Sequence, residues 1–142
     1  MKTILVSACL LGAACRYDGK SKPSPEIIAL RDKYNIIPVC PEIYGGLPTP
    51  RVPCEIKDGG VFSLTGENRT AEYLRGAGET LRLAEIFGCD TAVLKERSPA
   101  CGCGEIYDGS FSGTLVKGDG VCAALLKKNG VRVLGESRIK EI

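Results

Sequence analysis

The sequence predicts an α/β fold: a single three-layer domain with a mostly parallel four-stranded sheet, helices on both faces and small hairpin insertions. Apolar strand-like runs alternate along the chain with helix-like segments, which is the pattern of parallel strands joined by right-handed crossovers. The 142 residues are enough for one domain with a buried core, and no repeat or linker divides them. Three of the strand-like runs end in cysteine, which draws attention to the carboxyl edge of the sheet.

The composition excludes several kinds of site. Histidine is absent, so His-based triads, His general bases and mixed Cys/His zinc sites are excluded. The chain has 19 Lys and Arg against 17 Asp and Glu, without a run of like charge. This balance argues against a surface dedicated to binding nucleic-acid phosphates. Eight cysteines in a chain of this pattern are more typical of metal, cluster or redox chemistry than of disulfides.

The N-terminus gives little sign of export or membrane insertion. No stretch of the chain is long enough to span a membrane. Lys2 and the run from Thr3 to Ala14 imitate a signal peptide only loosely, because the charged region is a single lysine. We therefore expect a cytoplasmic protein.

The first two elements are a strand and a helix. Thr3 to Ala8 is a short apolar run with β-branched residues, which predicts a buried strand ending at Cys9. A capping hydroxyl at Ser24, followed by proline and glutamate, predicts a helix start, and this helix is expected to run to about Tyr34.

The second strand, Ile36 to Val39, ends in Cys40. Pro38 cannot donate a hydrogen bond to a neighbouring strand, which favours an edge position. The segment from Cys40 to Arg51 is rich in Gly and Pro, so we expect a shaped loop. A small hairpin around Asp58-Gly59-Gly60 follows.

A long helix is predicted from about Thr70 to Phe87, ended by Gly88. Gly76 and Gly78 weaken it, so we expect another segment to pack closely there. Its apolar face is expected to consist of Leu74, Ala77, Leu81 and Ala84.

The third strand, Thr91 to Glu96, leads into Ser98-Pro99-Ala100-Cys101-Gly102-Cys103-Gly104. A second hairpin or irregular loop around Asp108-Gly109 is expected next, then a helix capped by Asp119. The last strand is Val131 to Leu134. The expected order of the four strands, numbered along the chain, is 2-1-3-4, which places the first strand between the second and third.

This strand order brings Cys9, Cys40 and Cys101 to one edge of the sheet. Three thiolates from separate strands can hold a metal or cluster and leave one coordination position open. Their spacing matches neither a ferredoxin run nor a zinc ribbon, and three ordinary buried cysteines are the alternative. Cys103 remains open as a fourth ligand, a sulfur carrier or a bystander. The remaining four are expected to be structural: Cys15, Cys54, Cys89 and Cys122.

Five further residues near these thiols can carry chemistry. Glu42, two residues after Cys40, is a candidate proton carrier, and a solvated loop glutamate is the alternative. Ser98 either caps a turn or turns its hydroxyl toward the site. The other three could hold a planar or anionic ligand, or instead form surface ion pairs: Arg16, Tyr17 and Arg51.

Several segments together resemble the thiouracil desulfidases, a family long described as a domain of unknown function. The resemblance covers essentially the whole chain, residues 1–142. It is carried by Ser7-Ala8-Cys9-Leu10-Leu11-Gly12, Arg16-Tyr17-Asp18-Gly19, Cys40-Pro41-Glu42, Gly45-Gly46-Leu47-Pro48, Ser98-Pro99-Ala100-Cys101-Gly102 and Tyr107-Asp108-Gly109.

The resemblance implies a [4Fe–4S] cluster on Cys9, Cys40 and Cys101, with functional roles for Glu42 and Ser98. The implied activity is removal of sulfur from a thiolated pyrimidine (a thiouracil-type base, nucleoside or nucleotide), giving the oxo base and hydrogen sulfide. Nucleic acid is not an expected partner, although thionucleotides derived from tRNA belong to the same class of substrate.

Two other functions stay open at this point. One is a non-catalytic, thiol-based redox or metal sensor that uses Cys101 and Cys103. The other is an α/β binding module whose cysteines are incidental.

Overall fold

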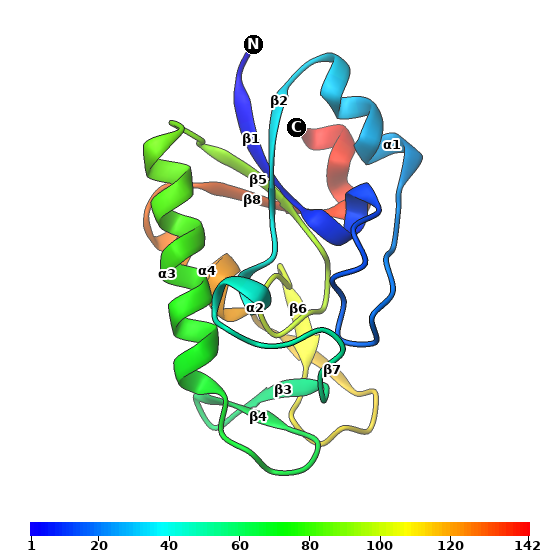
Figure 1. Cartoon of the computed structure of the whole chain (residues 1–142). Coiled ribbons are helices and arrows are strands. Elements are labelled where there is room, and N and C mark those ends of the chain that lie inside the picture. Colours follow the sequence, from blue (N-terminus) through cyan, green and yellow to red (C-terminus); the bar gives the residue numbers. More distant parts are fainter.

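The computed structural model describes all residues from 1 to 142 and has a four-stranded parallel sheet at its centre (Figure 1). The strand order is β2-β1-β5-β8, which confirms the predicted order and the edge position of the strand that contains Pro38. Every neighbouring pair is parallel. The strands are β1 (Thr3–Ser7), β2 (Asn35–Val39), β5 (Thr91–Leu94) and β8 (Arg132–Gly135).

Helices cover both faces of the sheet, as predicted. Successive side chains of a strand point to opposite faces, so Leu5 joins one apolar cluster and Ile4 and Val6 join the other. The first cluster packs against α3 (Thr70–Ile86) and α4 (Val121–Lys128). The second packs against α1 (Pro25–Ile28) and the 3-10 helices η1 (Ala8–Leu11), η2 (Ala29–Asp32) and η3 (Glu136–Glu141). None of these helices is long and apolar enough to cross a membrane.

Two antiparallel hairpins lie beyond the carboxyl ends of the parallel strands (Figure 1). The carboxylate of Glu55 joins them, because it accepts hydrogen bonds from the backbone N–H groups of Gly109 and Phe111 at 3.0 and 3.1 Å. The first hairpin was predicted, and the second is the hairpin of the two alternatives, hairpin or irregular loop, that the sequence left open. They consist of β3 (Cys54–Lys57) with β4 (Gly60–Ser63), and of β6 (Glu105–Tyr107) with β7 (Leu115–Lys117).

Two predictions about helix extent were wrong. The first helix ends at Ile28 and continues as the 3-10 helix η2, although Ser24 caps its start by accepting the N–H of Ile27 at 3.4 Å. The segment after β2 is not all loop, since α2 (Pro41–Tyr44) begins directly after Cys40. An extended residue followed by proline at the first helical position is a good helix start, and this local signal outweighs the Gly and Pro that follow.

The long helix α3 agrees with its predicted bounds and, except for one residue, with its predicted face. Ala77 and Ala84 are buried, and Leu81 packs against the core. Leu74 is 59% exposed, so its place on that face was wrong. The buried residues are Tyr73, Gly76, Ala77, Thr80 and Ala84.

The two glycines of α3 differ in their surroundings. A Cβ on Gly76 would lie 1.8 Å from the carbonyl oxygen of Pro41, so the expected close packing is present there. A Cβ on Gly78 would meet nothing within 4 Å, so the same expectation was wrong for Gly78.

Asp119 does not cap α4, which corrects another prediction. The residue before the helix is Gly120, and no side chain caps the first turn. The Asp119 carboxylate instead accepts the N–H of Gly104 at 2.8 Å and pairs with Lys127 at 3.0 Å. This contact ties the loop after Cys103 to α4.

Candidate functional site

A cavity of about 570 Å³ opens at the carboxyl edge of the sheet, between the strand ends and the two hairpins. Its walls include all eight residues that the sequence singled out: Cys9, Arg16, Tyr17, Cys40, Glu42, Arg51, Ser98 and Cys101. They come from segments far apart along the chain and meet because the strands are parallel and adjacent.

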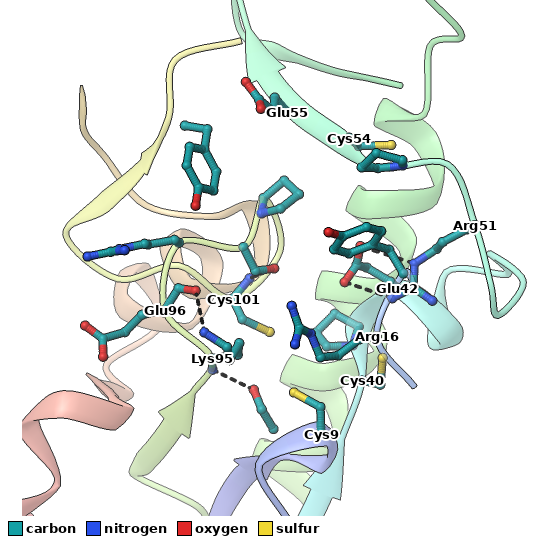
Figure 2. A pocket seen from close by; sticks show the side chains of 18 of the residues that line it. Cys9, Arg16, Cys40, Glu42, Arg51, Cys54, Glu55, Lys95, Glu96 and Cys101 are labelled. Atoms are coloured by element: carbon teal, nitrogen blue, oxygen red, sulfur yellow. Dashed lines mark hydrogen bonds and ion pairs between the residues drawn. The ribbon is translucent and has the colours of Figure 1, made fainter. Parts of the chain in front are cut away.

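The three thiols each follow a different strand. Cys9 lies in η1 directly after β1, Cys40 lies between β2 and α2, and Cys101 lies in the turn after β5. Cys9 and Cys101 are 7% and 5% exposed. Figure 2 shows the three side chains reaching into the same part of the cavity.

Burial is the main influence on the protonation of two of these thiols. It raises the pKa of Cys9 and of Cys101. The charges of Lys95 and Arg16 act in the opposite direction at Cys9. Buried thiols of this kind keep their protons when no metal is bound, and a metal displaces those protons when it binds.

The arrangement fits a group larger than one metal ion. No three acidic or thiol side chains converge closely enough to hold a single ion. Cys9, Cys40 and Cys101 nevertheless line one cavity together. Three cysteine ligands around a common space, with no fourth required, fit an iron–sulfur cluster with one iron open to a ligand.

A buried ion pair lies beside the thiols. Arg51 contacts both carboxylate oxygens of Glu42, at 3.2 Å (Nη2 to Oε1) and 3.4 Å (Nε to Oε2). The hydroxyl of Tyr73 donates to Oε2 at 2.6 Å. Glu42 is therefore held by the protein at the cavity wall and is not a freely solvated loop residue.

Ser98 caps the turn that carries Cys101. Its Oγ accepts the N–H groups of Ala100 at 3.0 Å and of Cys101 at 3.1 Å. The turn cap is one of the two arrangements expected from the sequence, and Ser98 also lines the cavity. With its oxygen accepting two backbone donors, the hydroxyl proton remains available to a group in the cavity.

The comparisons with known proteins agree with one another. The profile of the 2-thiouracil desulfurase family matches residues 4–138. The chain belongs to the 2-thiouracil desulfurase family. This confirms the resemblance found in the sequence.

Two individual relatives span almost the whole of this desulfurase-family chain. The "Uncharacterized protein YbbK" of Bacillus subtilis (strain 168) is 42% identical over 149 residues, covering 98% of this chain and 99% of its own. A solved structure described as the [4Fe-4S]-dependent thiouracil desulfidase TudS is 44% identical, with a TM-score of 0.94, covering 99% of this chain and 95% of that one. The α/β fold is therefore that of TudS.

Arg16 and Tyr17 line the desulfurase-family cavity together. The Arg16 guanidinium carbon lies 5.9 Å from the centre of the Tyr17 ring, within the range of a cation–π contact. Tyr17 is 43% exposed, which leaves much of its surface accessible. Arg16 lies close to the three strand-end thiols (Figure 2), so the two side chains offer a ring surface and a positive charge to the cavity.

The other cysteines divide into two groups. Cys15 and Cys54, expected to be structural, line the cavity together with the three strand-end thiols. Cys103 does not line the cavity, and its thiol donates to the carbonyl oxygen of Val133 at 3.4 Å. The other two are buried in the core, as expected: Cys89 and Cys122.

Three residues of the site were not predicted from the sequence: two that line the cavity and one that lies behind Glu42. Lys95, directly after β5, and Glu55, in β3, both line the cavity, although the sequence alone suggests that such charged residues face solvent. Tyr73 lies behind Glu42 on α3. The signal for Tyr73 was present, because it lies four residues before Ala77 on the buried face and a tyrosine there needs a hydrogen-bond partner.

Proposed function

We propose that this chain is a [4Fe–4S]-dependent desulfidase for thiolated pyrimidines. The reaction converts a thiocarbonyl and one water into a carbonyl and hydrogen sulfide, so atoms balance without a reductant or oxidant. The observation that carries the proposal is the meeting of Cys9, Cys40 and Cys101, from three adjacent parallel strands, on one cavity wall. Membership in the 2-thiouracil desulfurase family supports it.

The three cysteines would hold the cluster, which when bound supplies a Lewis acid with affinity for sulfur. Glu42 takes a proton from the attacking water and passes a proton toward the departing sulfur, because no histidine is available for either step. Ser98 offers its remaining hydroxyl proton to the cavity. Arg16 and Tyr17 position the ring in the cavity.

The substrate is proposed to be a free thiouracil-type base or its nucleoside or nucleotide, with tRNA-derived thionucleotides included. Arg16 and Arg97 line the cavity and can pair with a phosphate. We further propose that residues 1–142 form one desulfidase domain, and that it works in the cytoplasm, where its eight free thiols remain reduced.

The test is turnover by protein loaded anaerobically with iron and sulfide. Unlabelled 2-thiouracil, 2-thiouridine and 2-thiouridine 5′-monophosphate are supplied separately, after free sulfide has been removed. Uracil or its nucleoside or nucleotide should appear together with sulfide in equal amounts. The metal-free protein should release neither. A loaded protein that releases no sulfide from any of the three would overturn the proposal.

The redox-sensor alternative depends on a bond between Cys101 and Cys103. Cys101 lines the cavity and Cys103 does not, and the Cys103 thiol donates to the Val133 carbonyl. This separation favours the desulfidase. Mass spectrometry of oxidised metal-free protein distinguishes the two functions, since only the sensor requires the Cys101–Cys103 disulfide.

A further inference from the structure

Glu42 is held from two sides by groups on other segments. Arg51 belongs to the loop after α2 and contacts both carboxylate oxygens, while Tyr73 belongs to α3 and donates to Oε2 at 2.6 Å. The Arg51 side chain is 4% exposed and that of Glu42 is 16% exposed. Little water therefore competes for these contacts.

Arg51 is fully occupied within the protein. Besides Glu42, its Nη2 donates to the carbonyl oxygen of Cys15 at 2.9 Å, and its Nη1 donates to Pro48 O and Thr49 Oγ1, both at 3.2 Å. A guanidinium has five N–H donors, and Arg51 makes five contacts with protein acceptors. Arg51 therefore holds Glu42 in a buried ion pair, whereas the sequence left a surface ion pair and contact with a planar or anionic ligand as alternatives.

Tyr73 can act only as a donor to Glu42. It is 2% exposed, and burial together with the charge of Glu42 raises the pKa of its hydroxyl, which keeps the proton in place. Tyr73 does not line the cavity, so it lies behind Glu42 as seen from the substrate side.

Glycine contacts fix the distance between the helices that carry these two residues. A Cβ on Gly45, just after α2, would lie 2.0 Å from the carbonyl oxygen of Glu72. A Cβ on Gly76 of α3 would lie 1.8 Å from that of Pro41. The backbones of α2 and α3 are therefore in direct contact at two points next to Glu42 and Tyr73. These contacts, and not side-chain packing, set the distance between the two residues.

We propose that Tyr73 is a positioning residue for Glu42 which, with Arg51, holds the carboxylate in the single orientation that serves the proton transfers. This inference rests on the proposed function. A carboxylate on a short helix has several rotamers, and catalytic geometry must be held within about 0.5 Å. Two fixed donors select one rotamer while leaving Glu42 on the cavity wall.

The first test is kinetic and uses the loaded protein. Tyr73→Phe removes only the hydroxyl, and it should lower kcat by about tenfold to a hundredfold, as expected for a lost hydrogen bond to a charged group. KM and iron content should stay at wild-type values, because Tyr73 touches neither substrate nor ligand thiols. The matched control is Tyr44→Phe on α2, which removes a hydroxyl bonded to the Pro38 carbonyl at 3.0 Å and should leave kcat unchanged.

A double-mutant cycle separates positioning from a general structural role. In a Glu42→Gln background, Tyr73→Phe should cause no further loss of kcat, since the group it positions no longer exchanges protons. An equal loss in both backgrounds, or a rise in KM, would overturn the inference.

A crystal structure of metal-free Tyr73→Phe gives a readout independent of activity. The Glu42 carboxylate should leave its wild-type position or occupy more than one orientation, while in Tyr44→Phe it should stay. An unchanged single orientation in Tyr73→Phe would overturn the inference. If loaded wild-type protein released no sulfide while Glu42 moved in Tyr73→Phe, the proposed function would fail and the holding role of Tyr73 would stand.

Discussion

The turn after β5 places two neighbouring cysteines in different regions of the molecule. Cys101 is 5% exposed and lines the cavity with Cys9 and Cys40. Cys103 lies outside the cavity and packs against the core on the side of α3 and α4, where its thiol bonds the Val133 carbonyl. The N–H of Gly102 donates to Ser98 O at 2.8 Å, which closes a tight turn over residues 98–102 that contains Cys101 and ends before Cys103.

The difference shows what makes a cysteine a ligand candidate in this fold. Nearness in sequence does not suffice, because the turn separates Cys103 from Cys101 within two residues. The carboxyl ends of adjacent parallel strands bring Cys9 and Cys40 to Cys101 from distant parts of the chain. We propose that this placement, and not nearness in sequence, selects the three ligands.

The largest expected effect is on the iron content. Cys101→Ser, Cys9→Ser and Cys40→Ser should each lower the iron bound after anaerobic reconstitution from about four atoms per chain to about one or fewer, because three thiolates are needed to hold the cluster. Cys103→Ser is the matched control and should bind as much iron as the wild type. Iron analysis and visible absorbance provide the measurement. Loss of iron in Cys103→Ser would contradict the different roles assigned to Cys101 and Cys103.

The next effect concerns turnover with the cluster intact. Glu42→Gln keeps the size of the side chain and removes its proton exchange, so kcat should fall by about 10²–10⁴, the usual contribution of general acid–base catalysis. Iron content and substrate affinity should be unchanged in equilibrium binding measurements. Near-normal turnover would mean that the protons come from another group, with Ser98 the next candidate.

A smaller effect concerns the contact between α2 and α3. Gly76→Ala places a Cβ against the Pro41 carbonyl and should lower the free energy of unfolding by about 1–3 kcal/mol or more. Gly78→Ala on the same helix meets nothing within 4 Å and should raise it by about 0.5–1 kcal/mol. Chemical denaturation of the metal-free proteins measures both. Equal effects of the two substitutions would contradict the close contact.

The smallest expected effect is a difference in chemical modification between two thiols outside the cavity, Cys122 and Cys103. Burial raises the pKa of Cys122 to about 12, and its side chain is fully buried. At pH 8 only about one molecule in ten thousand carries the thiolate that reacts with iodoacetamide. Cys122 should stay unmodified in the native protein while the partly exposed Cys103 reacts, as read by peptide mass spectrometry. Native labelling of Cys122 as fast as in the unfolded chain would contradict this burial.

Much of the fold was predictable because it depends on patterns local to each segment. The strands alternate with helices, right-handed crossovers limit the strand order, and Pro38 indicates the edge strand. The three strand-end cysteines and Glu42 follow from that order. α2 was missed because Cys40-Pro41 is a start signal inside a segment that otherwise reads as a loop.

The supporting contacts of the site were not predictable, because they join residues far apart along the chain. Tyr73 reaches Glu42 across 31 positions, and Arg51 reaches the Cys15 carbonyl across 36. The sequence indicates that Arg51 and Tyr73 need partners but not which ones. The role of Asp119 was misread for the same reason, since Gly104 and Lys127 use the carboxylate that a helix cap would need.

The most direct test of the central claim is the sulfide released from 2-thiouracil by the two turn variants after anaerobic reconstitution. A cluster on Cys9, Cys40 and Cys101 predicts that Cys103→Ser releases sulfide and uracil in equal amounts at the wild-type rate. It predicts that Cys101→Ser releases neither. Sulfide release by Cys101→Ser, or its loss in Cys103→Ser alone, would contradict the claim.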